Sequence, residues 1–348
     1  MRKRIATNAG VHIDPAHLRR IAANIKAVEA MPHAPAWDGR AVHDRIVAAN
    51  DSLFVQSYFS EPLTQFAVGY RDSAQIEATL EFIAPQVPVP RRFEYAAATN
   101  IEEFYSETTD DLRAIGADFK SVKYTESKVN AKTDNRGLMI TVDLDEVADK
   151  ANWRELYTGK LVRRLKRNAL RRALALLSAA ATNTAKTWDT SSGKDPDQDV
   201  NSELITGATA SGVRPNRVLY GDTAWSKRML AHRAQNTAGG FSSAGMTPEQ
   251  VAGLLAVDGV LVSKERYATS ESAKAEIVSN LVIMFNAMSG ADAEDSSNIK
   301  RFVSAVEGGG FMRVYEQQLT AKLYTICVEH YDLTKITSTL GIRQFTVS

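Results

Sequence analysis

Histidines are the residues of this chain best suited to bind a metal ion or to move a proton near neutral pH. The six histidines are His12, His17, His33, His43, His232 and His330. His12 and His17 are five positions apart, so a helix turns them away from a common face, and the four-residue spacing of helical zinc sites is absent. His232 and His330 are isolated in the sequence. This spacing predicts surface or core histidines and no metal site.

Three aspartates, Asp195, Asp197 and Asp199, have the spacing of the first calcium ligands of an EF-hand. The later positions do not fit, because Val200 stands where that loop needs glycine and Thr206 where it needs the closing glutamate. We therefore interpret these aspartates as part of an exposed, solvated polar loop.

Nucleophile and phosphate-binding motifs are missing from the sequence. Gly308-Gly-Gly is not followed by lysine and serine or threonine, and Gly240-Phe-Ser-Ser-Ala-Gly does not meet the G-x-S-x-G spacing. Cys327 lies in an apolar run, which favours a buried, inert thiol over a nucleophile.

Paired carboxylates offer no general acid and base. Glu102 and Glu103, like Asp110 and Asp111, are adjacent in the sequence. Neighbouring side chains point to different sides of a helix or strand, so these carboxylates make poor catalytic partners. We therefore predict no catalytic, cofactor-binding or metal-binding residue, and a protein that is not an enzyme.

The composition is that of an ordinary globular protein. The chain has 348 residues, 44% of them hydrophobic and 24% charged, which suggests roughly two domains and argues against wholesale disorder. Lysine and arginine number 42 against 41 acidic residues, a net charge of +1. So neutral a chain does not coat nucleic acid over its whole surface, because phosphate binding needs excess positive charge.

Neither the cysteine content nor the apolar segments point to a secreted or membrane protein. The single cysteine excludes an intrachain disulfide and a cysteine-based zinc site. No apolar segment follows the basic Met1-Arg-Lys-Arg, and the most apolar helical stretch, residues 174–181, is far too short to span a bilayer. We expect a soluble protein that folds in a reducing cytoplasm and has no membrane partner.

The N-terminal segment predicts an amphipathic helix over residues 14–31. Asp14 is suited to cap it and Pro15 to its first turn. Its apolar residues recur at spacings of three and four: Leu18, Ile21, Ile25 and Val28. A single short helix on an irregular tether cannot bury this stripe alone, so it must dock on its own domain or on another subunit.

The next segments predict extended structure. Three prolines within residues 85–90 favour an edge strand or a connector, and a strand starts near Arg91. Residues 116–146 are interpreted as a long, charged hairpin, with alternating strands around Val122 and around Ile140 and a turn at residues 132–137. A two-stranded ribbon alone is marginal in water, so something must cover it, for example a neighbouring subunit.

A long helix is predicted over residues 152–183. It would form a rod of roughly 45 Å. Its apolar face is opposed by a basic face: Arg154, Lys160, Arg163, Arg164, Lys166, Arg167, Arg171 and Arg172. This face is interpreted either as solvated or ion-paired within the chain, or as a contact for another subunit or a polyanion.

Residues 214–345 predict a compact α/β or α+β unit. Short strands are expected at residues 217–220, 259–262, 281–285 and 342–347. Thr247-Pro-Glu-Gln is a capping box that begins a helix, and residues 236–245 are expected to form a flexible loop.

The order of these elements resembles the major capsid (coat) protein of tailed bacteriophages, which has the Hong Kong 97-type fold. The local resemblance lies in three passages: Asp143-Leu-Asp-Glu-Val-Ala-Asp-Lys-Ala-Asn-Trp, Pro215-Asn-Arg-Val-Leu-Tyr-Gly-Asp-Thr-Ala-Trp-Ser and Met246-Thr-Pro-Glu-Gln-Val-Ala-Gly-Leu-Leu. The resemblance covers most of the chain from about residue 50. It is specific in the order of elements and weak in motifs, since the family has no catalytic signature.

The resemblance implies an α+β, Hong Kong 97-like fold. Its parts would be an N-terminal arm (1–62), an extended β-hairpin loop with flanking strands (63–146), a spine helix and peripheral domain (147–214), an axial domain (215–325) and a C-terminal return strand to the peripheral domain (326–348). Copies would assemble through pentamers and hexamers into an icosahedral shell around double-stranded DNA. Further partners would be a scaffolding protein, a portal and a decoration protein. The location would be the virion capsid, assembled in the host cytoplasm.

Three other hypotheses of function remain open at this point. An encapsulin-type nanocompartment shares the architecture and encloses an enzyme instead of DNA. A DNA-binding protein would act through the basic helix face, with binding that falls steeply with salt. A hydrolase would need a site that none of the motifs above reveals.

Overall fold

The computed structural model describes residues 59–70, 76–97, 112–113, 115, 118–119, 127–288, 297–306 and 310–348. The predicted N-terminal helix over residues 14–31 lies outside the described residues. So do four histidines, the paired carboxylates and the first strand of the predicted hairpin: His12, His17, His33, His43, Glu102, Glu103, Asp110, Asp111 and Val122.

The first sheet is built around one long strand, β13. Its strands are β1 (Gln86–Pro88), β4 (Asp134–Asp143), β11 (Ile299–Ser304), β12 (Met312–Gln318) and β13 (Leu323–Ile336). β4 pairs with one edge of β13, while β12 and β11 pair with successive halves of its other edge, all antiparallel. β1 joins β11 in parallel and ends the sheet, which confirms the extended edge predicted from the prolines.

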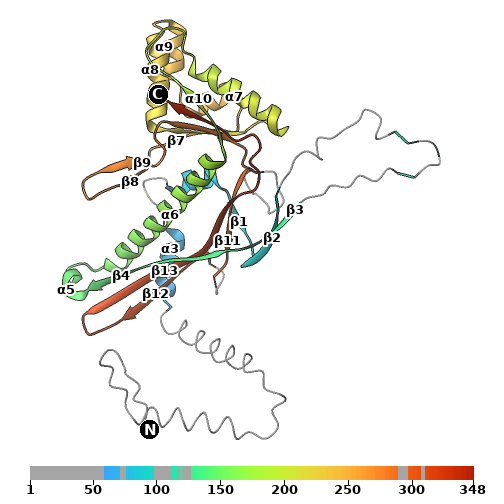
Figure 1. Cartoon of the computed structure of the whole chain (residues 1–348). Helices are drawn as coiled ribbons and strands as arrows, with labels where there is room; N and C mark the ends of the chain where they lie inside the picture. Colours follow the sequence, from blue (N-terminus) through green and yellow to red (C-terminus); the bar gives the residue numbers. More distant parts are fainter. Residues whose placement is uncertain are drawn as a thin grey trace, which may run out of the picture. The chain divides into compact units, whose positions relative to one another are not determined.

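A long helix covers one face of this sheet (Figure 1). Helix α6 (Trp153–Ala180) confirms the helix predicted over residues 152–183. The short helix α5 (Leu144–Val147) leads into it, capped by the Asp143 carboxylate, which accepts a hydrogen bond from the Asp145 amide. Helix α3 (Glu61–Gly69) packs against both β12 and α6. Leu161, Val162 and Leu165 of α6 are buried against the sheet.

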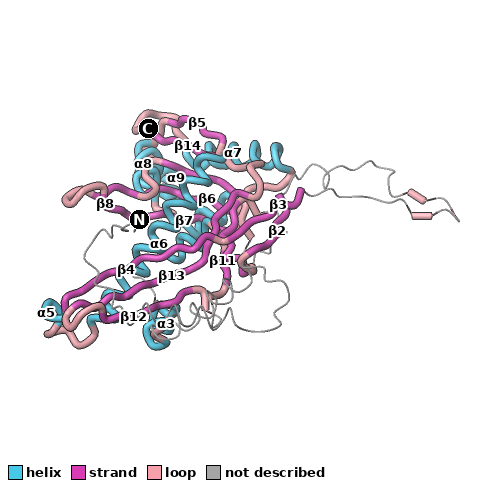
Figure 2. The backbone as a smooth tube through the Cα atoms, turned by 60° about the horizontal axis from the view of Figure 1, so that its bottom comes forward, coloured by secondary structure: helices cyan, strands magenta, loops and turns pink. Residues whose placement is uncertain are grey.

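The second sheet has the order β5-β14-β10-β6-β7 (Figure 2). Its strands are β5 (Thr182–Lys186), β6 (Arg217–Gly221), β7 (Gly259–Ser263), β10 (Leu281–Phe285) and β14 (Arg343–Val347). The four strands predicted in the C-terminal unit are therefore confirmed. At Gly221 an added Cβ would lie 1.9 Å from the Ser279 carbonyl oxygen, so only glycine fits there.

Helices pack on both faces of the second sheet. One layer holds α4 (Ile76–Ile83) and the C-terminal half of α6, which bury Leu219, Ile283 and Phe285 of the sheet. The other face buries alternate residues, among them Val218, Tyr220 and Met284. The helices of that layer are α7 (Pro196–Ser211), α8 (Asp222–Ala234), α9 (Ala238–Ala244) and α10 (Pro248–Leu255).

Two ribbons complete the described structure. β2 (Arg92–Ala97) pairs antiparallel with β3 (Ser127–Lys132), and β8 (Arg266–Ala268) pairs with β9 (Lys274–Glu276). None of the described helices is both long and apolar enough to cross a membrane.

The hairpin predicted over residues 116–146 is wrong at its turn, since residues 134–137 belong to a strand. β3 pairs with β2, and β4 pairs with β13 in a different sheet. The expected turn is almost continuous strand, interrupted only at Thr133. Gly137 lies inside β4 and lets the backbone of the neighbouring strand approach closely, because an added Cβ would lie 3.2 Å from the Val328 carbonyl oxygen.

Two predicted loops are helical instead. The loop expected over residues 236–245 contains α9, whose first turn is capped by Thr237, since its hydroxyl accepts a hydrogen bond from the Gly240 amide. The acidic loop ends at Asp195, whose carboxylate caps α7 by accepting a hydrogen bond from the Gln198 amide.

Each sheet combines strands from distant parts of the chain. β11 and β12 lie within residues 215–325 but belong to the first sheet. The last strand, β14, lies in the second sheet between β5 and β10, and therefore does not return to the sheet that holds β13.

Candidate assembly surfaces

Within the described ranges, no group of three histidine, cysteine or acidic side chains is placed to hold a metal ion. The EF-hand-like aspartates have separate structural roles. Asp195 caps α7, Asp197 is buried against Arg228, and Asp199 contacts Lys186 and the Trp188 indole. All three carboxylates therefore accept hydrogen bonds from other groups of the chain.

The two described histidines both lie beside a buried carboxylate. Arg228 is fully buried and donates to Asp197 through Nε (2.6 Å) and Nη2 (2.7 Å), while His232 Nε2 lies 3.1 Å from the same carboxylate. Burial favours a raised pKa for Asp197, but the hydrogen bonds from His232 and Arg228 outweigh it and lower that pKa. This cluster joins α7 to α8 within the helical layer that covers the second sheet.

His330 belongs to a cluster on the face of the first sheet that α6 covers. Asp332 of β13 is 1% exposed and lies 2.7 Å from Arg136 Nε of β4, 3.1 Å from Arg172 Nη2 of α6 and 3.5 Å from His330 Nε2. Burial acts to raise the pKa of Asp332, but His330, Arg172 and Arg136 together hold it at about 2. The ionised carboxylate therefore links the sheet to the long helix.

Four of the eight cations on the predicted basic face of α6 have hydrogen-bond or ion-pair partners within the chain. Lys166 is buried and donates to Glu77 (2.8 Å) and to the Tyr70 carbonyl, and Arg172 pairs with Asp332. Arg163 donates to the Tyr70 hydroxyl at 2.6 Å, and Arg154 lies 3.4 Å from Glu316. These partners lie far away in the sequence, so the sequence alone did not indicate which cations are paired.

The first sheet has one face that the described residues leave partly open. Residues of β4, β13 and β12 align across it as the row Met139–Cys327–Tyr315. Met139 is 70% exposed, whereas its neighbours Leu138 and Ile140 pack toward α6 on the opposite face. Cys327 is half-buried, and burial followed by the Glu329 charge raises the pKa of its thiol, which disfavours a nucleophilic role. We call this row and its surroundings the open face.

The β2–β3 ribbon is anchored at one end of the open face. Phe93 and Tyr95 of β2 pack on Phe302 of β11, with ring centroids 4.6 and 5.3 Å from that of Phe302. Val87 completes this small core. The residues that connect β2 to β3 are largely outside the described ranges, so only the anchored base of the ribbon is described.

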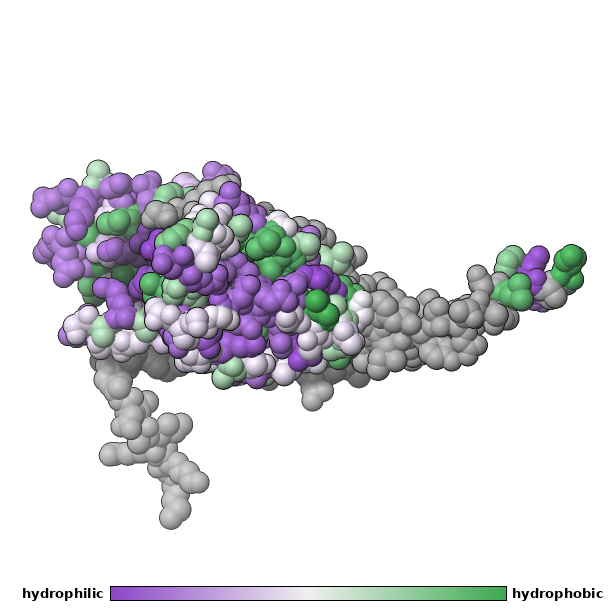
Figure 3. All heavy atoms as spheres, turned by 90° about the horizontal axis from the view of Figure 1, so that it is seen from above, coloured by the Kyte–Doolittle hydropathy of each residue, from purple (hydrophilic) through white to green (hydrophobic). Residues whose placement is uncertain are grey.

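Further exposed apolar residues lie on the outer helices of the second sheet. Leu230 of α8 is 48% exposed, Phe241 of α9 54% and Leu254 of α10 55%. On the face drawn in Figure 3, hydrophobic side chains form separate patches among hydrophilic ones. Isolated exposed apolar residues are normal, but three on consecutive helices mark a candidate contact surface.

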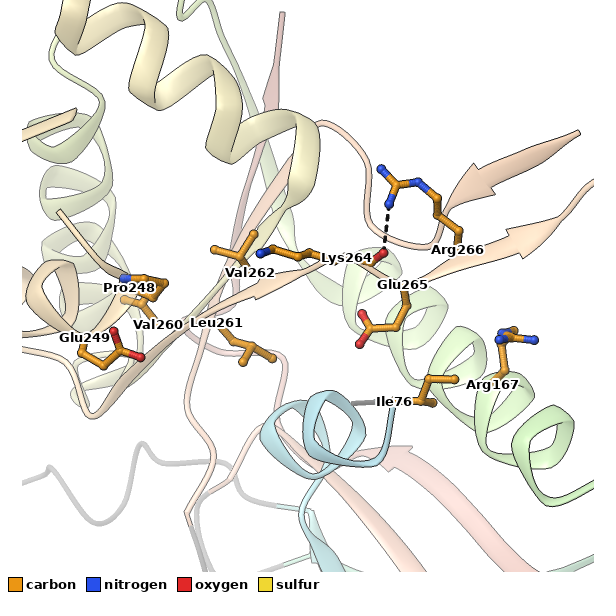
Figure 4. A pocket seen from close by; sticks show the side chains of 10 residues that line it. All are labelled: Ile76, Arg167, Pro248, Glu249, Val260, Leu261, Val262, Lys264, Glu265 and Arg266. Carbon is orange, nitrogen blue, oxygen red and sulfur yellow. Dashed lines mark hydrogen bonds between the residues drawn. The ribbon is translucent and has the colours of Figure 1, made fainter. Parts of the chain in front are cut away.

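A cavity of about 540 Å³ lies among α4, α6, β7 and β8 (Figure 4). Ile76 and Leu261 supply apolar lining, and Arg167 and Glu265 supply charge. Glu265 is 7% exposed, and its carboxylate accepts hydrogen bonds from the Thr79 and Ser263 hydroxyls. These hydroxyls account for the buried carboxylate.

The sequence matches no known family model and no curated protein. Solved structures do resemble the chain. A phage-related protein from Bordetella bronchiseptica has a TM-score of 0.61 at 17% identity, over 83% of this chain and 96% of that chain. A capsid structure of cyanophage P-SCSP1u has a TM-score of 0.49 at 10% identity, over 80% and 90%. The SrpI encapsulin from Synechococcus elongatus has a TM-score of 0.43 at 10% identity, over 80% and 90%.

The likeness to the Bordetella protein extends over nearly all of that protein. At 17% identity it concerns the fold and not the individual residues. The chain therefore has the Hong Kong 97-type fold that its sequence resembles.

Proposed function

We propose that this chain is the major capsid protein of a tailed bacteriophage and assembles through pentamers and hexamers into an icosahedral shell around double-stranded DNA. The observation that carries the proposal is the Hong Kong 97-type fold, on which the sequence resemblance and the likeness to a phage-related protein agree. The open face, the ribbon and the outer helices of the second sheet supply surfaces for contacts between copies.

The open face and the ribbon are proposed as complementary surfaces of neighbouring subunits. A two-stranded ribbon gains little stability alone, and the aromatic contacts of Phe93 and Tyr95 secure only its base. A neighbour's ribbon lying on the open face would bury Met139 and support the ribbon in one contact.

The second sheet with α7–α10 is proposed as the axial domain, and the first sheet with α6 as the peripheral domain. The exposed Leu230, Phe241 and Leu254 would then lie where axial domains meet around the capsomer centre. A scaffolding protein, a portal and a decoration protein remain proposed partners, and the virion, assembled in the host cytoplasm, the proposed location.

The test is expression of the chain alone and with a candidate scaffolding protein, followed by negative-stain microscopy. Wild type should form uniform closed shells. Met139→Asp should prevent closed shells while the subunit stays folded, because a carboxylate would be buried in an apolar contact. Met139→Leu is the matched control and should assemble normally.

Two results would contradict parts of this proposal. A wild-type monomer that persists at high concentration under both conditions would exclude a shell protein. Closed shells that contain a protein cargo and no nucleic acid would instead indicate the encapsulin-type alternative, and the contents are read by nuclease-protected absorbance and mass spectrometry.

A further inference from the structure

We propose that four cationic side chains of α6, Lys160, Arg164, Arg167 and Arg171, bind the phosphate backbone of double-stranded DNA. We call these four residues the α6 stripe. The inference rests on the proposed function for the source of the DNA, but the binding itself belongs to the unassembled subunit and is measured there.

The spacing of the α6 stripe places its members on one line. They follow one another at intervals of four, three and four residues. At 3.6 residues per turn all four lie within about 60° of one another around the helix, and the eleven-residue span covers about 16 Å. One strand of a duplex has a phosphate every 3.4 Å along the axis, so the stripe matches the length of about five phosphates.

Within the described ranges, no acidic side chain pairs with the cations of the α6 stripe. Arg164 and Arg167 have no hydrogen bond or ion pair within the described part of the chain, and Arg167 Nε is buried without a partner. The Arg171 guanidinium lies 3.9 Å from the centroid of the Tyr267 ring, and Lys160 Nζ lies 4.6 Å from that of Tyr157. An aromatic ring orients a cation without cancelling its charge, so the N–H groups remain able to donate.

The composition of this face favours nucleic acid over a protein partner. Every residue from 160 to 172 that is not buried is lysine, arginine or asparagine. The one acidic residue of α6 is Glu155, more than a turn before the α6 stripe begins. The exposed apolar residue of this part of α6 is Leu156, one turn before Lys160, and the Tyr157 and Tyr267 rings lie against Lys160 and Arg171. Protein interfaces depend on buried aromatic or apolar anchors, whereas a phosphate backbone needs only positive charge at suitable intervals.

The neighbouring cavity limits where the DNA can lie. Arg167 and Lys264 both line this cavity (Figure 4). Two carboxylates, Glu249 and Glu265, also line the cavity and would repel phosphate. The duplex is therefore expected to follow the α6 stripe and to stay out of the cavity.

The experiment measures binding of a fluorescein-labelled 20-base-pair duplex to unassembled full-length subunits by anisotropy, between 50 and 200 mM salt. Four phosphate contacts predict a slope of log K against log salt of about −3.6, a roughly 150-fold loss of affinity over this range. The double substitution Arg164→Gln with Arg171→Gln should halve the slope, so that affinity falls only about 12-fold.

The matched control removes the same charge elsewhere. Arg154 and Lys322 have exposed side chains outside the α6 stripe, so Arg154→Gln with Lys322→Gln should leave the slope unchanged. Equal slopes for wild type and the Arg164/Arg171 variant, or an equal loss in the control, would overturn the proposal. Tighter binding of polyglutamate than of DNA would overturn it in favour of an acidic protein partner.

Shell formation is scored separately for the same variants by microscopy. If the Arg164/Arg171 variant forms closed shells and wild type shows no stripe-dependent DNA binding, the capsid proposal stands and this inference fails. Thermal unfolding of each variant verifies that the subunit is folded.

Discussion

The two sheets differ in how completely the rest of the subunit covers them. The second sheet is packed on both faces, and Leu219, Ile283 and Met284 have no exposed surface. The first sheet is packed by α6 on one face, while the other exposes 70% of Met139. Among the described residues, the second sheet is therefore covered on both faces, whereas the first sheet is covered on one face only.

The strongest test of this contrast pairs one substitution in each sheet. Phe285→Ala empties a fully buried position between β10 and α4 and should lower the free energy of unfolding by about 3–5 kcal/mol. Met139→Ala should change it by less than about 0.5 kcal/mol, because the side chain is mostly exposed. Urea unfolding of disassembled subunits measures both, and similar losses for the two variants would refute the contrast.

The covered face of the first sheet should be sensitive to acid through Asp332. Its pKa is held at about 2, below the ordinary 3.8, so its stabilising contribution is present above about pH 4 and is lost as the pH falls toward 2. The lowering corresponds to about 2 kcal/mol. The stability difference between wild type and Asp332→Asn should therefore shrink by about that amount between pH 6 and pH 2.

Asp145→Asn is the control for the acid experiment. Asp145 pairs with Lys322 on the surface, and both side chains are about two-thirds exposed. An exposed pair contributes about 0–1 kcal/mol, so this variant should follow the wild-type pH curve closely. A difference for Asp332→Asn that stays constant down to pH 2 would show that the buried carboxylate is not ionised preferentially in the folded state.

The smallest expected effect concerns the helical layer of the second sheet. The Thr247 hydroxyl accepts from the Gln250 amide, and the Gln250 side chain accepts from the Thr247 amide, which closes the capping box of α10. Thr247→Ala should cost about 1 kcal/mol in thermal or urea unfolding, and Thr247→Ser should retain most of the stability. An alanine variant as stable as wild type would mean that packing of α10 alone fixes its first turn.

Local patterns in the sequence correctly predicted several helices and strands. The apolar periodicity of α6, the capping box at Thr247 and the prolines around β1 each indicated the element that the structure contains. Helix α7 also has a local signal, since Asp195-Pro196 is the same cap-and-proline pair as Asp14-Pro15. The polar composition of this segment favoured a loop instead of a helix.

Pairing partners could not be predicted in the same way. Alternation identified β4 as a strand with Leu138 and Ile140 on one face, but a period of two does not reveal which strand lies beside it. The partner, β13, begins 180 residues after Asp143. The ion pairs of Lys166 with Glu77 and of Arg172 with Asp332 could not be predicted for the same reason. Only the complete fold brings these two carboxylates to α6.

The position of β13 and β14 determines when the subunit can become complete during synthesis. β13 lies between β4 and the β11–β12 edge, and β14 lies between β5 and β10, although both are made after every other strand of their sheets. A nascent chain lacking them has an open gap in each sheet, so folding during translation cannot finish either half. Each sheet can therefore close only after its own late central strand, β13 or β14, has been synthesised.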